Sequence, residues 1–397
     1  MRQTSGRKEM IMNLEQEFYN AFRCAPEYRY RAPARINLIG EHIDYNGGRV
    51  LPAAISCYIK ALVSKRDDQI ISAYSTDTKS GFSIDLNKIK YDKANGWCNY
   101  VFGVFQTLRL AGYRTPFGLN ILINSEIPLG SGLSSSAALL DLITYIANDL
   151  YGLGISLKNI AKLAQNTENQ FCGLRCGIMD EAAIALGLSN KCLLLDCAKY
   201  EYEYIDMDLG EYTFVVMKTN VPRSLVSSKY NDRVDECEKG LKAVQQDFDV
   251  SNLCELHEED LFRVEKLIGD EVVYRRVRHV VTENERVRKF VLALRAHKVE
   301  ELGKILNASH KSLKEDYEVT GEYLDAIQEA AINAGAIGAR MTGAGFGGCA
   351  IALIKKSDFA KFKESVISYY TNKVHLEPEV FNVDIVDGPT KEEDYAN

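Results

Sequence analysis

The alternation of apolar and polar positions is clearest between residues 119 and 152. Apolar residues at every second position over 119–123 predict a strand, and apolar residues at helical spacing over 139–150 predict a helix that ends at Gly152. Between them lies the glycine- and serine-rich segment Pro128-Leu-Gly-Ser-Gly-Leu-Ser-Ser-Ser-Ala-Ala138. The pattern therefore predicts a strand, a glycine loop and the start of a helix in direct succession.

This loop has a composition that suits phosphate. Gly130 and Gly132 allow the backbone to come close to a ligand, and the first amides of the following helix have no partners within that helix. Ser134, Ser135 and Ser136 add three hydroxyl groups. A serine-rich cap on a buried helix explains the same residues without a ligand. The chain has no Gly-Lys-Ser or Gly-Lys-Thr sequence, which argues against a P-loop NTPase.

The same periodicity predicts the other elements of the chain. Strands are expected at 28–31, 50–64, 70–74, 192–195, 213–218, 349–354 and 380–386, and helices at 13–23, 98–111, 157–172 and 357–373. The strands at 50–64 and 70–74 are expected to pair through the polar turn 65–68. Residues 229–334 are mostly helical in period and rich in charge, which predicts a second, helix-rich lobe.

A late segment, Gly343-Ala-Gly-Phe-Gly-Gly348, has the glycine spacing of a dinucleotide-binding loop. A Rossmann loop opens a helix, whereas this segment precedes the apolar strand at 349–354. We therefore interpret its glycines as a turn that another stretch of backbone approaches closely.

Composition narrows the class of protein. With 397 residues, 46% hydrophobic and 26% charged, the chain is globular and long enough for two or more domains. A net charge of -7 without a basic cluster argues against nucleic acid or an acidic membrane as a partner. No stretch has the length and apolarity of a signal peptide or a membrane span, so a soluble cytoplasmic protein is expected.

The ten cysteines are expected to be reduced thiols. Only Cys172 and Cys176 are closely spaced, and no second cysteine pair or nearby histidine completes a zinc site in the sequence.

Two segments place carboxyl groups among apolar or small neighbours. In residues 31–52, glycines divide an apolar run into turns that could present Glu41, His42 and Asp44 from one loop. The alternative is an exposed polar loop between strands. In Cys176-Gly-Ile-Met-Asp-Glu181, Asp180 either caps the helix that begins there or is a functional carboxylate.

Three segments together resemble the GHMP kinase superfamily, and the first is similar to the signature of the galactokinase family. They are Arg35-Ile-Asn-Leu-Ile-Gly-Glu-His-Ile-Asp-Tyr-Asn46, Gly132-Leu-Ser-Ser-Ser-Ala137 and Thr342-Gly-Ala-Gly-Phe-Gly-Gly348. Shorter matches in the same order are Trp97-Cys-Asn-Tyr100, Cys176-Gly-Ile-Met-Asp180, Ser227-Ser-Lys-Tyr-Asn231, Arg278-His-Val-Val-Thr-Glu-Asn284 and Asp316-Tyr-Glu-Val319. The resemblance runs from about residue 25 to residue 390.

This resemblance implies an α+β fold of two lobes, with mixed sheets, helices and the active site in the cleft between the lobes. The expected division is an N-terminal extension and first helix at 1–24, an N-terminal lobe at 25–215 and a helix-rich C-terminal lobe at 216–397. The N-terminal lobe would carry the sugar loop, the ATP loop and the catalytic aspartate.

The implied activity is ATP- and Mg²⁺-dependent phosphorylation of the C1 hydroxyl of α-D-galactose, which gives α-D-galactose 1-phosphate for galactose catabolism in the Leloir pathway. The enzyme is expected to be a monomer whose partners are galactose and ATP. Two alternatives stay open: a 1-kinase for N-acetylgalactosamine or another galactose-like sugar, and a non-catalytic sensor that binds galactose and ATP.

The resemblance also implies roles for individual residues. Asp180 would be the catalytic carboxylate beside the anomeric hydroxyl, with Arg35 as its cationic partner. The residues expected to bind the sugar are Glu41, His42, Asp44, Gly177 and Tyr230. Those expected at the nucleotide are Trp97, near the adenine, and Gly130, Ser131, Gly132, Leu133, Ser134, Ser135 and Ser136, around the triphosphate. Ser136 and Glu168 match the magnesium ligands.

Two residues depart from the galactokinase pattern. Ala34 stands where the family has glycine, and Glu181 stands where it has glutamine after the catalytic aspartate. A second carboxyl group next to Asp180 is expected to raise the pKa of one of the two, with consequences for rate, pH optimum and sugar preference.

Overall fold

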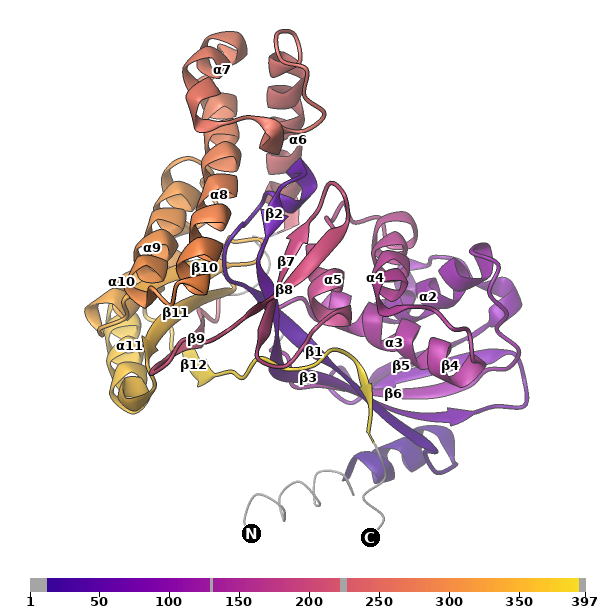
Figure 1. The fold of residues 1–397 in the computed structure, drawn as a ribbon. Coiled ribbons are helices and arrows are strands. Elements are labelled where there is room, and N and C mark those ends of the chain that lie inside the picture. The colour runs from indigo at the N-terminus through magenta and orange to yellow at the C-terminus, as the bar shows by residue number, and fades with distance from the viewer. Residues whose placement is uncertain (1–12, 129–130, 222–226, 393–397) are drawn as a thin grey trace.

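The computed structural model describes residues 13–128, 131–221 and 227–392, with residues 227 and 228 described by their backbone alone. Figure 1 shows two groups of elements side by side, one built mainly from the first half of the chain and one from the second. Gly130, expected at the triphosphate, lies outside the described residues.

The first lobe is built on a six-stranded sheet with the order β13-β1-β3-β6-β4-β5. Its strands are β1 (Tyr28–Asn37), β3 (Pro52–Lys65), β4 (Ile70–Ser75), β5 (Ser80–Asp85), β6 (Leu119–Ser125) and β13 (Thr390–Lys391). Because β6 separates β3 from β4, the expected pairing of 50–64 with 70–74 is wrong. All five residues 119–123 of β6 are buried, which suits a central strand, so the chain crosses from β3 to the far side of β6.

Helices and a small sheet complete this lobe. The helices are α2 (Cys98–Leu110), α3 (Ser135–Tyr151), α4 (Leu157–Asn166) and α5 (Met179–Ala185), and residues 13–22 are also helical. Both α3 and α5 pack against β1 and β3. As expected, α3 ends at Gly152, which has a left-handed conformation (φ +63°). The small sheet has the order β2 (Arg49–Val50), β7 (Lys191–Asp196) and β8 (Glu201–Asp206).

The second lobe has an antiparallel sheet with the order β10-β11-β9-β12. Its strands are β9 (Tyr212–Lys218), β10 (Gly338–Thr342), β11 (Cys349–Lys355) and β12 (Glu379–Asn382). Its helices are α6 (Ser227–Val244), α7 (Leu261–Ile268), α8 (Glu271–Arg295), α9 (Val299–Glu315), α10 (Gly321–Asn333) and α11 (Phe359–Val374). The predicted helix-rich region is therefore confirmed. In Figure 1, α7 and the adjoining ends of α6 and α8 project from the body.

Four elements differ from the sequence expectation, and two of them carry site residues. Strand β1 continues to Asn37, so Arg35 lies in a strand and not in a loop. After α4 the chain forms a π-helical turn, η4 (Thr167–Phe171), which carries Glu168. Strands β5 and β8 were not expected, because exposed or half-buried residues occupy most of their positions and leave no apolar alternation. Among the described residues, no helix is both long and apolar enough to span a membrane.

Candidate active site

A cavity of about 280 Å³ opens between the two lobes. Its walls come from the sugar loop (residues 38–48), the phosphate loop (residues 131–134) with the start of α3, the segment 174–180, α6 and the glycine loop (residues 343–348). The expected site residues that line it are Arg35, Glu41, His42, Asp44, Gly132, Ser134, Ser135, Ser136, Glu168, Gly177, Asp180 and Tyr230. Segments far apart in the sequence thus meet in one place.

Arg35 and Asp180 form a two-point ion pair in this cavity. Nε of Arg35 donates to Oδ1 of Asp180 and Nη2 donates to Oδ2, both at 2.8 Å. The remaining guanidinium nitrogen, Nη1, donates to the carbonyl oxygen of Gly132 at 2.6 Å, and the Ser134 hydroxyl donates to Asp180. Arg35 is buried, whereas 31% of the Asp180 side chain stays exposed. The carboxylate is therefore fixed in orientation and still open to a ligand.

Local structure explains how the pair forms. A register shift between Pro33 and Ala34 interrupts the pairing of β1 with β3 just before Arg35, and such a bulge changes the direction of the following side chain. Asp180 lies in the first turn of α5, whose N-cap residue is Ile178, without a capping side chain. Asp180 is thus not the helix cap, and its partners are Arg35 and Ser134.

The phosphate loop and the glycine loop pack backbone against backbone. A β-carbon on Gly343 would lie 2.6 Å from the carbonyl oxygen of Gly132, and one on Gly348 would lie 2.9 Å from that of Ser131. This confirms the interpretation of the late glycines as a closely approached turn. Ser131 and Leu133 are buried, and the Leu133 carbonyl accepts from the Arg35 amide at 3.4 Å.

Within the sugar loop, Glu41 is bound by the second lobe. It is buried and forms an ion pair with Arg340 of β10, which also donates to the carbonyl oxygens of Asn37 at 2.8 Å and Leu38 at 3.1 Å. Burial raises the pKa of Glu41, although the charges of Arg340 and Arg35 oppose this effect. Arg340 was not expected from the sequence, because nothing in its neighbourhood marks it as functional.

Glu283 of α8 holds the backbone of the sugar loop. Its Oε1 accepts from the amides of Gly40 at 3.0 Å and Glu41 at 3.3 Å, and from the Ser309 hydroxyl at 2.8 Å. Burial alone would raise the pKa of Glu283, but the Arg286 guanidinium and other neighbouring charges lower it to about 2. Glu283 belongs to the matched segment 278–284, yet the sequence did not show what it contacts.

His42 connects the sugar loop to the glycine loop. Its Nε2 lies 3.2 Å from the carbonyl oxygen of Ala344, and its Nδ1 lies 3.0 Å from the Tyr45 hydroxyl, which in turn lies 2.8 Å from the Tyr317 hydroxyl. Burial lowers the pKa of His42 to about 3, so the ring is neutral at pH 7. A carbonyl only accepts, so Nε2 carries the proton and Nδ1 accepts from Tyr45. Both ring nitrogens are thus used by the protein.

Asp44 and Tyr230 complete the part of the cavity wall where a sugar is expected. Asp44 is half-buried and lies against Gly177, where any β-carbon would overlap its carboxylate. Burial, and next the charge of Asp180, raises the pKa of Asp44 to about 7. The Tyr230 ring on α6 lies 5.7 Å from the His42 ring. Trp97, in contrast, is not one of the described residues that line this cavity, and its indole nitrogen donates to the Ser80 hydroxyl at 3.4 Å.

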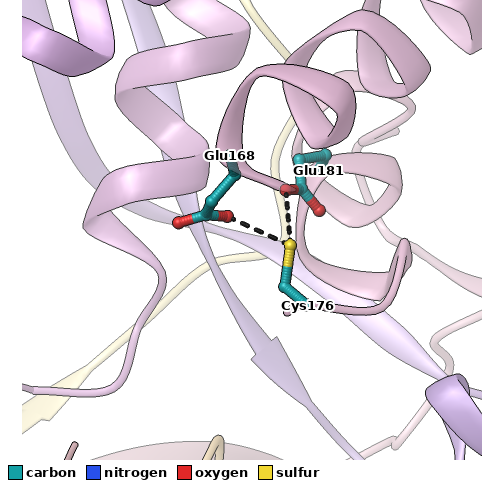
Figure 2. Close-up of side chains that lie close together, drawn as sticks. All are labelled: Glu168, Cys176 and Glu181. Carbon is teal, nitrogen blue, oxygen red and sulfur yellow. Dashed lines mark hydrogen bonds between the residues drawn. The ribbon is translucent and has the colours of Figure 1, made fainter. Parts of the chain in front are cut away.

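Ser136 and Glu168 also meet, as expected for a shared ligand set. The Ser136 hydroxyl hydrogen-bonds to the Glu168 carboxylate. Glu181 bonds to Glu168 as well, and burial, followed by the charge of Glu168, raises the pKa of Glu181 well above its ordinary value. The raised pKa that the second carboxyl group was expected to bring is found on Glu181, and Figure 2 shows this side chain turned toward Cys176.

Comparisons with known proteins agree with this arrangement. Residues 99–188 match the GHMP kinases N terminal domain, residues 16–65 match the galactokinase galactose-binding signature, and residues 290–372 match the GHMP kinases C terminal family. The chain is 44% identical over 380 residues to a galactokinase of Clostridium tetani, which covers 95% of this chain and 97% of the relative. A galactokinase of Clostridium acetobutylicum is 42% identical and covers 96% of this chain and 99% of that protein.

Solved structures show the same likeness. The galactokinase of Lactococcus lactis complexed with galactose has a TM-score of 0.94 and 40% identity, and covers 96% of this chain and 100% of that chain. A mevalonate kinase of Methanococcus jannaschii, with a TM-score of 0.63 and 20% identity, shares the fold over 91% of this chain. Together with the Arg35–Asp180 pair and the glycine loops around it, these matches establish that the chain belongs to the galactokinase family of the GHMP kinases.

Proposed function

We propose that this protein transfers the γ-phosphoryl group of ATP to the C1 hydroxyl of α-D-galactose and releases α-D-galactose 1-phosphate and ADP. The observation that carries the proposal is the Arg35–Asp180 pair, open to the cavity and hydrogen-bonded to the phosphate loop through Gly132. The relatives named above are galactokinases, and the Lactococcus lactis protein was solved with galactose.

The reaction requires alignment and charge neutralisation more than covalent chemistry. Phosphoryl transfer passes through a loose transition state, so the enzyme must hold the hydroxyl in line with the γ-phosphate. Asp180 still has free lone pairs after its bonds to Arg35 and Ser134, and it orients the C1 hydroxyl and accepts its proton late in the transfer. Arg35 and the first amides of α3 stabilise the charge that develops on the phosphate oxygens.

Ser136 and Glu168 would hold Mg²⁺. The direct contact of a hydroxyl with a nearly buried carboxylate at the cavity wall provides the oxygen donors that Mg²⁺ prefers. When bound, the ion neutralises charge on the ATP phosphates. Residues 131–136 surround the triphosphate in this proposal, and the adenine lies near Trp97.

The sugar lies against Glu41, His42, Asp44, Gly177 and Tyr230, which all line the cavity. Because Arg340 and Glu283 fix the loop that carries Glu41, the polar groups facing the sugar are preorganised. A sugar epimer leaves a buried polar group unpaired, which costs about 1 to 3 kcal/mol.

An ADP-release assay over galactose, N-acetylgalactosamine, glucose, arabinose and mevalonate tests the proposal. Galactose is expected to give the highest kcat/KM. A higher value for N-acetylgalactosamine would reassign the substrate, and ligand binding without ADP release from any sugar would identify a sensor. The monomeric state and cytoplasmic location expected from the sequence stay predictions, and light scattering after size exclusion tests the first.

A further inference from the structure

A thiol and two carboxyl groups converge beside the expected Mg²⁺ ligands. Sγ of Cys176 lies 3.4 Å from Oε2 of Glu168 and 3.7 Å from Oε1 of Glu181, and the three ligand atoms all lie within 4.8 Å of one another. Figure 2 shows one carboxylate oxygen of each glutamate directed toward the sulfur atom. They come from three different segments, namely η4, the loop before α5, and α5 itself.

These separations fit a tetrahedral cation. With metal–sulfur bonds of about 2.3 Å and metal–oxygen bonds of about 2.0–2.2 Å, the sulfur and oxygen ligands of a tetrahedral Zn²⁺ ion lie about 3.6 Å apart. Both measured sulfur–oxygen distances are close to that value. The site offers three protein ligands and leaves a fourth position open, as zinc sites with an exchangeable ligand do.

An independent observation indicates that the cluster is incomplete. The second carboxylate oxygen of Glu181 is buried and has no hydrogen-bond partner among the described residues. Both carboxylate oxygens of Asp141 on α3 are equally buried and unpartnered in the described part of the chain, and its charge interacts with that of Glu168. Buried carboxyl oxygens without partners are rare, and a bound cation is one arrangement that satisfies them.

We propose that Glu168, Cys176 and Glu181 bind a divalent cation of the zinc class, and that this cation competes with Mg²⁺ for Glu168. A thiolate together with carboxylates favours borderline cations such as Zn²⁺ over Mg²⁺, which prefers oxygen ligands in an octahedron. The cation reaches the site from the cavity, which both Glu168 and Cys176 line. Binding forms one metal–sulfur and two metal–oxygen bonds, and it releases to solvent both the thiol proton and the proton of the hydrogen bond between Glu181 and Glu168.

Cd²⁺ is the probe for the binding site, added alone to the metal-stripped full-length protein. One equivalent is expected to produce the ultraviolet thiolate-to-metal absorption band, and calorimetry with Zn²⁺ is expected to show one matching site. Cys176→Ser should abolish the band, and both Cys176→Ser and Glu181→Gln should weaken Zn²⁺ binding at least about tenfold. Cys172→Ser is the matched control, because this half-buried thiol lies four residues away and outside the cluster.

Thermal unfolding of each variant establishes that it is folded, and Glu181→Gln keeps the thiol if Cys176→Ser is unstable. The proposal is overturned if the wild-type protein gives no band, or if Cys176→Ser gives the same band as Cys172→Ser. In either case the three side chains form a hydrogen-bonded cluster only.

Inhibition is the second arm, and this arm rests on the proposed function. At fixed Mg²⁺, Zn²⁺ is expected to inhibit ADP release, with relief by added Mg²⁺ and with an inhibition constant at least about tenfold higher in Cys176→Ser. A band without any sugar phosphorylation would leave the cation site standing and remove the proposed function. Normal phosphorylation without a band would remove the cation site and leave the proposed function standing.

Discussion

Gly177 lies so close to Asp44 that a β-carbon at position 177 would overlap the Asp44 carboxylate. The segment that leads to Asp180 thus packs directly against the loop that carries Asp44. This packing requires a residue without a side chain at position 177. Gly177→Ala is expected to push Asp44 out of the cavity and to raise KM for galactose at least about tenfold, because the sugar then loses a charged acceptor. Steady-state kinetics measures both substrates, and KM for ATP should change less than KM for galactose. An unchanged KM for galactose would mean that the two segments move independently.

Removal of the Asp180 carboxylate tests the mechanism. Asp180→Ala is expected to lower kcat by roughly 10² or more, because the C1 hydroxyl loses its orienting proton acceptor. Asp180→Asn, which keeps the size of the side chain, separates this effect from the loss of a partner for the buried Arg35. Asp235→Asn is a matched control, since Asp235 is an exposed carboxylate that also pairs with an arginine, Arg175. Turnover by Asp180→Asn at the wild-type rate would exclude the proposed role.

The pKa of Asp44, raised to about 7 by burial and by the charge of Asp180, predicts a pH-dependent affinity for the sugar. The ionised carboxylate is the better acceptor for a sugar hydroxyl, so KM for galactose should rise up to about tenfold per pH unit below pH 7 and level off above it. Asp44→Asn should flatten this part of the profile. An identical slope in wild type and Asp44→Asn would assign the titration to another group.

The lowered pKa of Glu283 predicts that the free energy of unfolding decreases at acidic pH. Its pKa of about 2 in the folded protein lies below that of the unfolded chain, so its contribution is present above about pH 4.5 and is lost as the pH falls toward 2. Glu283→Gln is therefore expected to lower the free energy of unfolding at pH 7 by about 3 kcal/mol, with a smaller difference near pH 3. Urea unfolding at the two pH values measures this. Glu285→Gln is the control, because Glu285 lies on the same helix with an exposed partner, Arg288.

The position of the adenine can be followed by fluorescence, because Trp97 is the only tryptophan in the chain. Addition of ATP without sugar is expected to change the intensity or wavelength of tryptophan emission, and ADP should have a similar effect. Galactose alone should change it less, since Trp97 is not among the described residues that line the cavity proposed for the sugar. If calorimetry detects ATP binding but the tryptophan emission does not change, the adenine lies elsewhere.

What could be predicted from the sequence depended on how local each signal was. The end of α3 at Gly152 follows from apolar spacing and one glycine, and the structure confirms it. The partner of β3 depends on a strand more than 50 positions later, and the expected pairing with β4 was wrong. The two edges of β3 are taken by β1 and β6, and β4 pairs with the far edge of β6.

The distinction between local and long-range signals also applies to the site. The resemblance named the residues that now line the cavity together, including Arg35 and Asp180, which are 145 positions apart. It did not identify Glu283, which lies 243 positions from Gly40, or Arg340, which lies 299 positions from Glu41. Both residues bind the sugar loop from distant parts of the sequence, so the sequence of the loop itself does not reveal them. The cluster around Cys176 could not be predicted either, because its other members are carboxylates, whereas closely spaced cysteines and histidines are what marks a zinc site in a sequence.

Strand β13 pairs with β1, the strand that also carries Arg35. The two paired segments are separated by almost the whole chain, since Arg31 and Thr390 are 359 positions apart. During synthesis, β1 leaves the ribosome long before β13 and keeps this edge open until residues 390–391 have been translated. A product that stops before residue 390 therefore exposes an unpaired strand edge, which is a template for aggregation, and so incomplete chains are expected to be recognised by chaperones and proteases.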